Sequence, residues 1–248
     1  MFYRMIICKL MYSNENQRTN IMKTKILFIT SLLLIVGCSK EPINYETTLV
    51  EREGVFYTND TNEPYSGKVF SLYEDGKKKD EGTLKDGRMI SRTEWSWFEN
   101  GQKMSEETFK DGKLDGLSTE WYENGQKKFE EFYRDSLLNG LVKYWYENGQ
   151  KEFEGTFKNG KYDGLKTYWY ENGQKQLEGT QKNGKAEGLS TRWFENGKKK
   201  SEGTYKDGKK DGLETLWYEN GKKKSEGTFK DGKLISSKEW NEDGSLKE

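Results

Sequence analysis

The side chains best suited to chemistry in this sequence are glutamates that recur every 24 residues. They are Glu130, Glu154, Glu178, Glu202 and Glu226. Paired carboxylates can act as a general acid and a general base, but only where a cleft gives the two groups different environments. The chain has no histidine, so the commonest general base and metal ligand is missing. A solvated ladder balanced by lysines explains the pattern better, and we predict no catalytic residues, no cofactor and no metal site.

Two lysine triplets, at 198–200 and 222–224, raise the question of phosphate binding. The whole chain has 42 basic and 42 acidic residues, so it has no strong field that would attract nucleic acid. Beside so many carboxylates, the triplets are better explained as charges that keep a β-rich surface soluble. We therefore predict that nucleic acid is not a partner.

The segment from Met22 to Gly37 has the three parts of an export signal. It begins with Met-Lys-Thr-Lys, continues as an apolar run from Ile26 to Val36 and ends in a small residue. The run is shorter than the roughly 20 residues that a membrane-spanning helix needs, so we predict export rather than a membrane span. Residues 1–21 precede this complete signal, and we interpret them as a misassigned upstream start or an extended basic region.

Cys38 directly follows this segment, and its thiol is a candidate for lipid attachment. The sequence Ile35-Val36-Gly37-Cys38 resembles a lipobox. The resemblance implies cleavage before Cys38 and a diacylglycerol on its thiol, and acyl chains hold a protein at a membrane by about 0.8 kcal/mol per buried methylene. Ser39, in place of aspartate, resembles the pattern that directs lipoproteins to the outer rather than the inner membrane. The alternative is an ordinary cleaved signal with an incidental cysteine.

The rest of the chain is an internal repeat marked by regularly spaced glycines. The first turn of each unit ends at one of Gly76, Gly101, Gly125, Gly149, Gly173, Gly197, Gly221 and Gly244, spaced by 25, then five times by 24, then by 23 residues. A second turn, such as Lys158-Asn159-Gly160, lies in each unit, and Asn-Gly or Asp-Gly between Thr, Trp, Tyr and Phe is a strong hairpin signal. We predict an all-β fold, an elongated single-layer antiparallel β-meander of stacked β-hairpin repeats.

The pattern of apolar residues predicts three-residue turns with a glycine bulge at both turns of each unit. This geometry would pair Thr119 with Phe129 and Phe153 with Leu165. It would also place one recurrent set of side chains, together with the glycines of the Glu-Gly-Thr motif, on a single core face. That set is Trp97, Trp121, Trp145, Trp169, Trp193, Trp217 and Trp240, Leu117, Leu141, Leu165, Leu189 and Leu213, and Phe109, Phe157, Tyr205 and Phe229. Trp→Ala in a middle repeat is then expected to cost roughly 3 to 5 kcal/mol.

The residue before each tryptophan varies between repeats, and it lies on the opposite face of the predicted sheet. The candidate partner-binding residues there are Tyr144, Tyr168, Arg192 and Leu216, which follow Glu120 in the same row. Tyrosine and arginine are enriched at protein interfaces. Neutral drift on a solvated face explains the same variation, and the sequence slightly favours this explanation over binding.

The phrases Trp-Tyr-Glu-Asn-Gly, Glu-Gly-Thr-Phe-Lys-Asp-Gly-Lys and Asp-Gly-Leu resemble the bacterial variant of the MORN repeat, in proteins often grouped as YwqK-like antitoxins. The resemblance covers about 54–248 and implies an elongated single-layer antiparallel sheet. Glu107 and Glu131 depart from it, since other units have glycine there, and 132–137 lacks the usual second Asp-Gly turn.

The predicted organisation is therefore 1–21, the lipoprotein signal 22–37, a linker 38–53 and the repeat array 54–248. Two functions are consistent with it. The first is a non-catalytic binding module or scaffold, lipid-anchored at the cell envelope, whose partner is an envelope protein. The second, implied by the family label, is an antitoxin or immunity protein that neutralises a toxin by direct binding.

Overall fold

The computed structural model describes residues 41–247. Residues 1–21, the predicted signal 22–37 and the predicted lipidation site Cys38 lie outside the described residues. The residues from Pro42 onward belong to one structural unit. Within 41–247, no helix has the length and apolar character needed to cross a membrane.

Strands account for almost all of the regular structure between residues 41 and 247, and one four-residue helix, α2 (Tyr45–Thr48), lies near the start. The strands are β1 (Ile43–Asn44), β2 (Leu49–Arg52), β3 (Val55–Thr58), β4 (Gly67–Leu72), β5 (Lys78–Lys85), β6 (Arg88–Trp97), β7 (Lys103–Lys110), β8 (Lys113–Trp121), β9 (Lys127–Arg134), β10 (Leu137–Leu138), β11 (Gly140–Trp145), β12 (Lys151–Lys158), β13 (Lys161–Trp169), β14 (Lys175–Lys182), β15 (Lys185–Trp193), β16 (Lys199–Lys206), β17 (Lys209–Trp217), β18 (Lys223–Lys230) and β19 (Lys233–Glu239).

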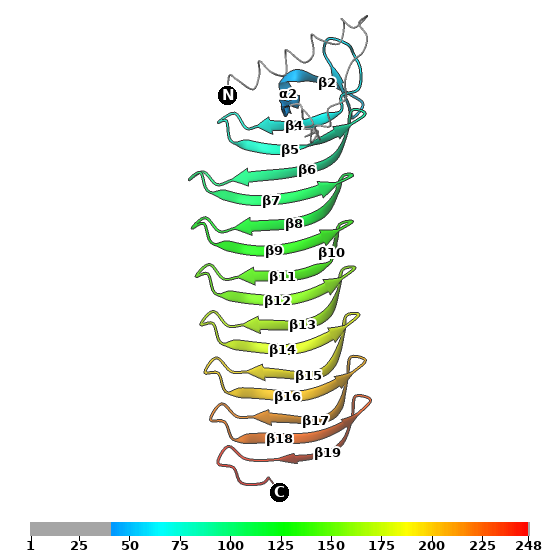
Figure 1. The fold of residues 1–248 in the computed structure, drawn as a ribbon. Coiled ribbons are helices and arrows are strands. Elements are labelled where there is room, and N and C mark those ends of the chain that lie inside the picture. The colour runs from blue at the N-terminus through cyan, green and yellow to red at the C-terminus, as the bar shows by residue number, and fades with distance from the viewer. Residues whose placement is uncertain (1–40, 248) are drawn as a thin grey trace, which may run out of the picture. The chain divides into compact units, whose positions relative to one another are not determined.

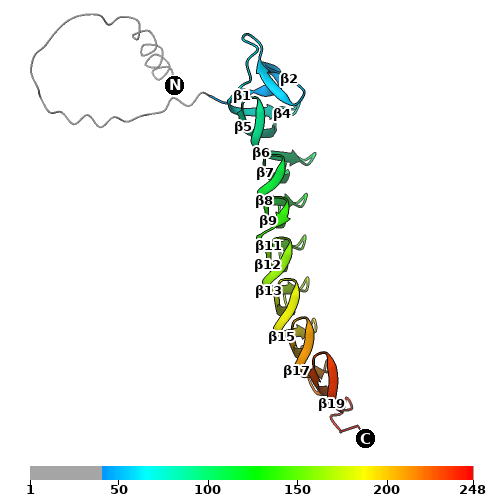
Figure 2. The same ribbon diagram turned by 90° about the vertical axis from the view of Figure 1, so that its right-hand side faces the viewer.

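From β4 to β19 the strands pair antiparallel with their neighbours along the chain, and the short β10 and β11 share one side of β9. The resulting sheet has 17 strands and includes β1, which runs parallel to β4. Figure 1 shows the strands stacked in chain order, and Figure 2 shows the same sheet edge-on as a column of hairpins. The predicted fold, a long single-layer antiparallel meander of hairpin repeats, is confirmed.

The turn after each tryptophan is a three-residue turn with a glycine bulge, as predicted. The Tyr122 amide donates to the Gln126 carbonyl at 2.8 Å, and the Gly125 amide donates to the Tyr122 carbonyl at 2.9 Å. Gly125 has a φ of +84°, a left-handed conformation that glycine adopts without steric cost. Asn124 accepts from the Gln126 amide at 2.9 Å and donates to the Glu147 carbonyl of the next repeat at 2.9 Å. The motif therefore closes its own turn and links it to the next one.

The second turn of each repeat differs from the prediction, because it has two residues and no bulge. Lys158 pairs directly with Lys161 across Asn159 and Gly160. These two residues have φ values of +49° and +75°, which is the type I′ geometry whose twist matches that of the flanking strands. The prediction of three-residue turns throughout is therefore wrong at this end of the hairpins.

A second bulge, next to each tryptophan, also changes the predicted register. Between Glu120 and Trp121 the pairing shifts, so that Glu120 pairs with Phe129 and Thr119 pairs with Glu130. Thr119 had been predicted to pair with Phe129. A shift of one residue moves a side chain to the other side of a sheet, so Phe129 lies opposite the tryptophans.

Phe153 also pairs differently from the prediction: the register between β12 and β13 shifts between Gly155 and Phe157, so that Phe153 pairs with Tyr168 rather than with Leu165. Phe153 forms a buried cluster with Val142 and Phe157, whose exposed fractions are 2%, 0% and 8% in that order. This cluster lies on the side that had been predicted to face a partner. The predicted core face is therefore wrong for Phe157 and its equivalents Phe109, Tyr205 and Phe229, and for the glycines of the Glu-Gly-Thr motif.

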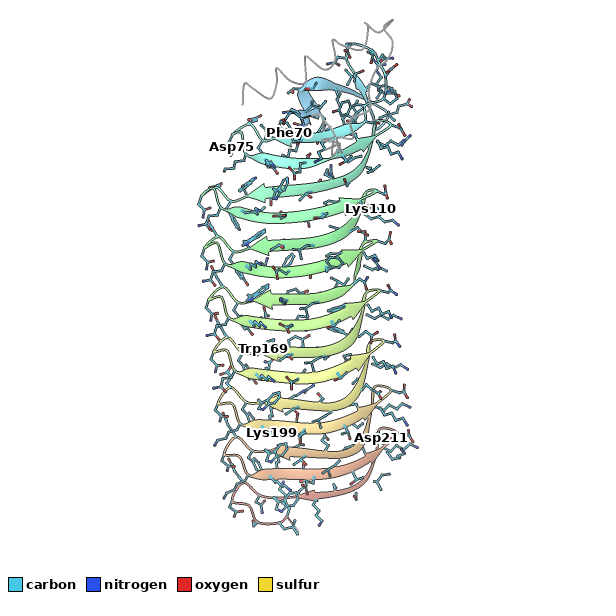
Figure 3. The ribbon with its side chains drawn as sticks, in the orientation of Figure 1. Phe70, Asp75, Lys110, Trp169, Lys199 and Asp211 are labelled. Atoms are coloured by element: carbon cyan, nitrogen blue, oxygen red, sulfur yellow. The ribbon has the colours of Figure 1, made fainter. Side chains whose placement is uncertain are left out.

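Two names describe the sides of the sheet from here on. The tryptophan face is the side that carries Leu117, Thr119 and Trp121 and their equivalents in other repeats. The tyrosine face is the side that carries Tyr144, Phe153 and their equivalents. Side chains stand on both faces, and tryptophans such as Trp169 lie near the edge formed by the Glu-Asn-Gly turns (Figure 3).

Residues 43–52, which the sequence assigned to a linker, form β1, α2 and β2. Tyr45 and Leu49 are buried there against Val69 and Leu84 of the first two repeat strands. The Tyr45 hydroxyl also donates to Asp80 at 2.8 Å. The segment therefore covers the tyrosine face at the N-terminal end of the array.

Candidate functional site

The recurring glutamates lie on the tryptophan face, and each is ion-paired with the lysine three residues before it. The Lys151 ammonium lies 2.7 Å from Glu154 and 5.4 Å from the centre of the Trp169 ring on the next strand. The same lysine–glutamate pairing recurs along the array. The predicted solvated ladder balanced by lysines is confirmed. Its carboxylates are engaged on an open sheet, which is no arrangement for acid–base catalysis.

Five leucines that the sequence placed in the core are instead exposed on the tryptophan face. The members of this leucine row are Leu117, Leu141, Leu165, Leu189 and Leu213, with exposed fractions of 46–55%. Their assignment to the core is wrong: the leucines stay exposed on a face where the nearby Thr119, Thr167, Thr191 and Thr215 are buried. Successive leucines lie two strands apart, a distance of roughly 10 Å. A threonine lies between successive leucines, as Thr156 does beside Leu141, and exposed apolar side chains repeated along one face can form part of an interaction surface.

The candidate partner-binding residues share the tyrosine face, as predicted. Tyr168 and Arg192 both pair in register with Leu177, so the two side chains flank one intervening residue. They line a hollow of about 380 Å³ together with Leu177 and Lys200. Arg192 is exposed and Leu216 is half-buried. The geometry brings Tyr168 and Arg192 to one hollow, and the role of all four residues in binding stays a prediction.

Tyr144 and Tyr168 are half-buried because Phe153 packs between them. The ring centres of Tyr144 and Tyr168 lie 5.3 and 4.7 Å from that of Phe153. The Tyr144 hydroxyl donates to Glu131 at 2.6 Å. Burial raises the pKa of both phenols above the usual tyrosine range. These two residues therefore stabilise the fold, and Arg192 is the one exposed member of the predicted stripe Tyr144, Tyr168, Arg192 and Leu216.

Six consecutive segments of the chain match the family model described as MORN repeat variant. They are residues 94–111, 114–135, 138–159, 162–183, 186–207 and 210–231. Together they cover more than half of the chain, and the short gaps between them fall at the second turns of the hairpins. This chain belongs to the MORN repeat variant family. No curated protein is significantly similar to it.

MORN repeats are generally modules that bind proteins or membranes and have no catalytic activity. The geometry of this MORN array agrees with that description, since its acidic groups are paired and its apolar groups are exposed in a row. Within residues 41–247, no three or more His, Cys, Asp or Glu residues are grouped so that they could hold a metal ion. Binding through the surface of the sheet is therefore what these repeats can do.

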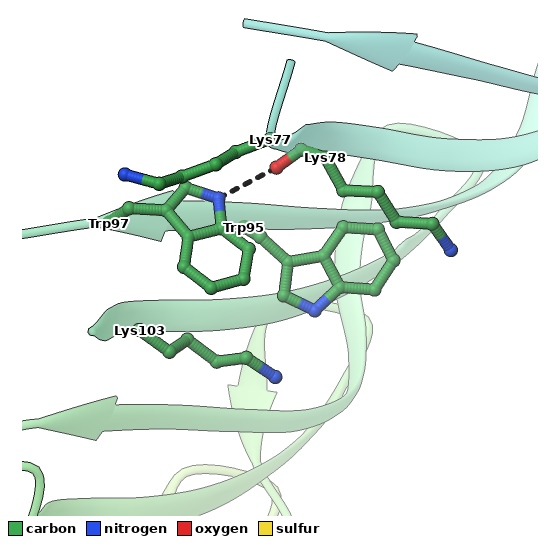
Figure 4. A pocket seen from close by; sticks show the side chains of 5 residues that line it. All are labelled: Lys77, Lys78, Trp95, Trp97 and Lys103. Carbon is green, nitrogen blue, oxygen red and sulfur yellow. Dashed lines mark hydrogen bonds between the residues drawn. The ribbon is translucent and has the colours of Figure 1, made fainter. Parts of the chain in front are cut away.

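The first matched MORN repeat carries two tryptophans on the tryptophan face, where several other repeats have a threonine and a tryptophan. Trp95 and Trp97 line a hollow of about 340 Å³ together with Lys77, Lys78 and Lys103 (Figure 4). The Trp97 indole donates to the Lys78 carbonyl at 2.8 Å. Each of the three lysines is ion-paired with a nearby carboxylate. The hollow thus has an apolar floor and a charge-balanced rim, and it extends the apolar surface of this face.

Proposed function

We propose that this chain is a lipid-anchored, protein-binding module of the bacterial cell envelope. The observation that carries the proposal is the leucine row on the tryptophan face, whose recurring glutamates are already paired with lysines. Fully burying an exposed leucine side chain is worth roughly 1.5–3 kcal/mol. These leucines are about half exposed, so each can contribute roughly half of that, and several in one row can supply a substantial part of the free energy of binding. The paired lysines and glutamates around the row can form the polar rim of such an interface.

A single-layer sheet suits this role because its backbone is held on both sides of almost every strand. The row therefore needs no rearrangement to meet a flat or helical partner surface, and binding loses little conformational entropy. The proposed partner is a protein with a complementary apolar strip, such as the face of an amphipathic helix.

Photo-crosslinking tests the binding surface. A benzoylphenylalanine placed at Leu165 in cells of the native host should give a discrete crosslinked protein. The matched control is Lys166, the next residue, which lies on the tyrosine face. Equal crosslinking from both positions, or none from Leu165, would contradict the leucine row. Crosslinks from Arg192 alone would transfer the role to the predicted tyrosine-face stripe. A crosslinked toxin whose effect this chain relieves would assign the antitoxin role instead.

Membrane fractionation tests the anchor, for which the lipobox-like sequence before Cys38 is the support. The native chain should sediment with outer-membrane vesicles and be released by detergent. Cys38→Ser should leave the chain unprocessed or soluble within the envelope. Unchanged fractionation of Cys38→Ser would count against lipid anchoring and leave the binding proposal standing.

A further inference from the structure

The tyrosine face has another hollow besides the one at Tyr168 and Arg192. It has a volume of about 340 Å³ and opens near the N-terminal end of the array. It lies where α2 approaches strands β5, β6 and β7. Asp80, Glu94 and Glu107 line it, together with the aromatic residues Tyr45 and Tyr73. It shares no leucine-row residue with the surface proposed above.

The three carboxylates follow one another directly across the sheet. Asp80 pairs in register with Glu94, and Glu94 pairs with Glu107 on the next strand. Neighbouring strands lie about 4.8 Å apart, and like charges placed directly opposite one another destabilise a sheet. At the position of Glu107, later repeats have glycines, for example Gly155 and Gly179. The acidic row is therefore particular to this end of the array and is unfavourable for the fold alone.

Asp80 forms the buried part of this row, and within residues 41–247 it has no ion-pair partner. Asp80 is only 2% exposed. Oδ2 accepts hydrogen bonds from the Tyr45 and Ser71 hydroxyls, both at 2.8 Å, and neither donor carries a charge. Oδ1 has no hydrogen-bond partner within residues 41–247. A buried carboxylate without a cationic partner is costly, which favours a cation nearby.

Glu107 is also without a counter-charge. In the described part of the chain it has neither a hydrogen bond nor an ion pair, and burial followed by the charge of Glu94 raises the pKa of its carboxyl. The two cationic residues that line the hollow are already ion-paired, Arg92 with a carboxylate of the row itself and Lys79 with a carboxylate outside the hollow. Arg92 is ion-paired with Glu94, and Lys79 lies 2.9 Å from Glu46. The hollow therefore contains more carboxylate than available cation.

We propose that this hollow receives the guanidinium group of an arginine of the protein partner. A guanidinium presents five donors in a planar fork that matches carboxylate oxygens, and it stacks on aromatic rings such as those of Tyr45 and Tyr73. An ammonium group matches the charge but lacks both the fork and the flat face. The inference rests on the proposed protein-binding function and adds to it the chemistry of one anchoring side chain.

The test uses the full chain, labelled with ¹⁵N, and three small probes. They are the N-acetyl methylamides of arginine, lysine and citrulline, the last being a neutral side chain of the same shape as arginine. The arginine probe should cause saturable shifts of the Ser96 and Ser105 amides, which border the hollow. The lysine probe should bind several-fold more weakly, and the citrulline probe should cause no saturable shift.

Two variants complete the test. Glu107→Gln should weaken binding of the arginine probe at least tenfold. Glu106→Gln is the matched control, because Glu106 is the adjacent residue on the other face, where it pairs with Lys103 at 2.6 Å, and it should leave binding unchanged. Equal binding of arginine and citrulline, equal binding of arginine and lysine, or equal effects of the two variants would overturn the proposal. The probes need no partner protein, so this outcome is independent of crosslinking from Leu165.

Discussion

At the scale of single residues, the asparagine of each Glu-Asn-Gly turn explains why this motif recurs. Asn148 accepts from the Gln150 amide at 2.9 Å and donates to the Glu171 carbonyl of the next repeat at 3.0 Å. The Tyr146 hydroxyl adds a second link to the next repeat, at 2.8 Å from the Trp169 carbonyl. Since these bonds join neighbouring repeats, each one contributes to the coupling that lets a linear array unfold cooperatively.

Asn148→Ala should lower the free energy of unfolding by about 1–2 kcal/mol, because two hydrogen bonds with backbone groups are lost. Asn148→Asp keeps the acceptor for the Gln150 amide but removes the donor to Glu171, so it should not restore stability. Urea unfolding followed by tryptophan fluorescence measures both variants. An Asn148→Ala variant as stable as the native chain would show that these bonds contribute nothing.

Glu107 should weaken the fold at neutral pH, because burial, and then Glu94 and Glu120, raise the pKa of its carboxyl above the usual 4.5. A raised folded-state pKa means that the folded chain binds the proton more tightly than the unfolded chain. The favourable contribution is then present below the unfolded pKa and is lost as pH rises through the folded one.

Glu107→Gln should therefore raise the urea midpoint at about pH 7 and leave it unchanged at about pH 3.5. Glu106→Gln, whose native carboxylate is ion-paired, should raise it at neither pH. A loss of stability in Glu107→Gln at neutral pH would contradict this description of the acidic row.

At the scale of elements, the two turns of a hairpin decide which face each side chain takes. The Glu-Asn-Gly turn has three residues and the Asn159-Gly160 turn has two, and a bulge beside each tryptophan adds one more shift. As a result the fully buried side chains, such as Phe153, lie on the tyrosine face. The leucines lie on the other face and remain exposed.

Phe153→Ala should cost about 3–5 kcal/mol, because it removes a ring that is 2% exposed and packs against Tyr144 and Tyr168. Leu165→Ala should cost less than about 1 kcal/mol, since Leu165 is 54% exposed. Trp169→Ala, for which the sequence predicted the larger loss, should fall between them because Trp169 is only half-buried. Urea unfolding of the three variants gives the order, and equal losses for Phe153 and Leu165 would contradict the assignment of faces.

At the scale of the whole molecule, the repeats, the hairpins and the single-layer sheet could be predicted because glycine spacing and Asn-Gly turns are local signals. Which side chains lie on which face could not be predicted, since the bulge between Glu120 and Trp121 has no marker in the sequence. A register shift of one residue moves every following side chain to the opposite face. The position of Tyr144, Tyr168, Arg192 and Leu216 on one face was predictable because they occupy equivalent places. The burial of the two tyrosines could not be predicted, because it depends on packing against Phe153.

The leucine row could have been found from the sequence by one further step. A single-layer sheet has no second layer to bury both faces, so one of the two apolar sets must face solvent or a partner. Choosing between them required the register. The acidic hollow could not be predicted from the sequence, because it forms only when residues 43–52 fold back onto β4 and β5 instead of serving as a linker.

Hydroxyl-radical footprinting of the purified chain and of the same chain in isolated cell envelopes tests the proposed role of the leucine row most directly. In the purified chain, Leu141, Leu165 and Leu189 should be oxidised readily and Phe153 should be protected. In envelopes, the leucines should become protected while Arg88, outside the row, keeps its reactivity. Leucines that are protected already in the purified chain, or that are oxidised equally in both samples, would contradict a partner-binding surface on the tryptophan face.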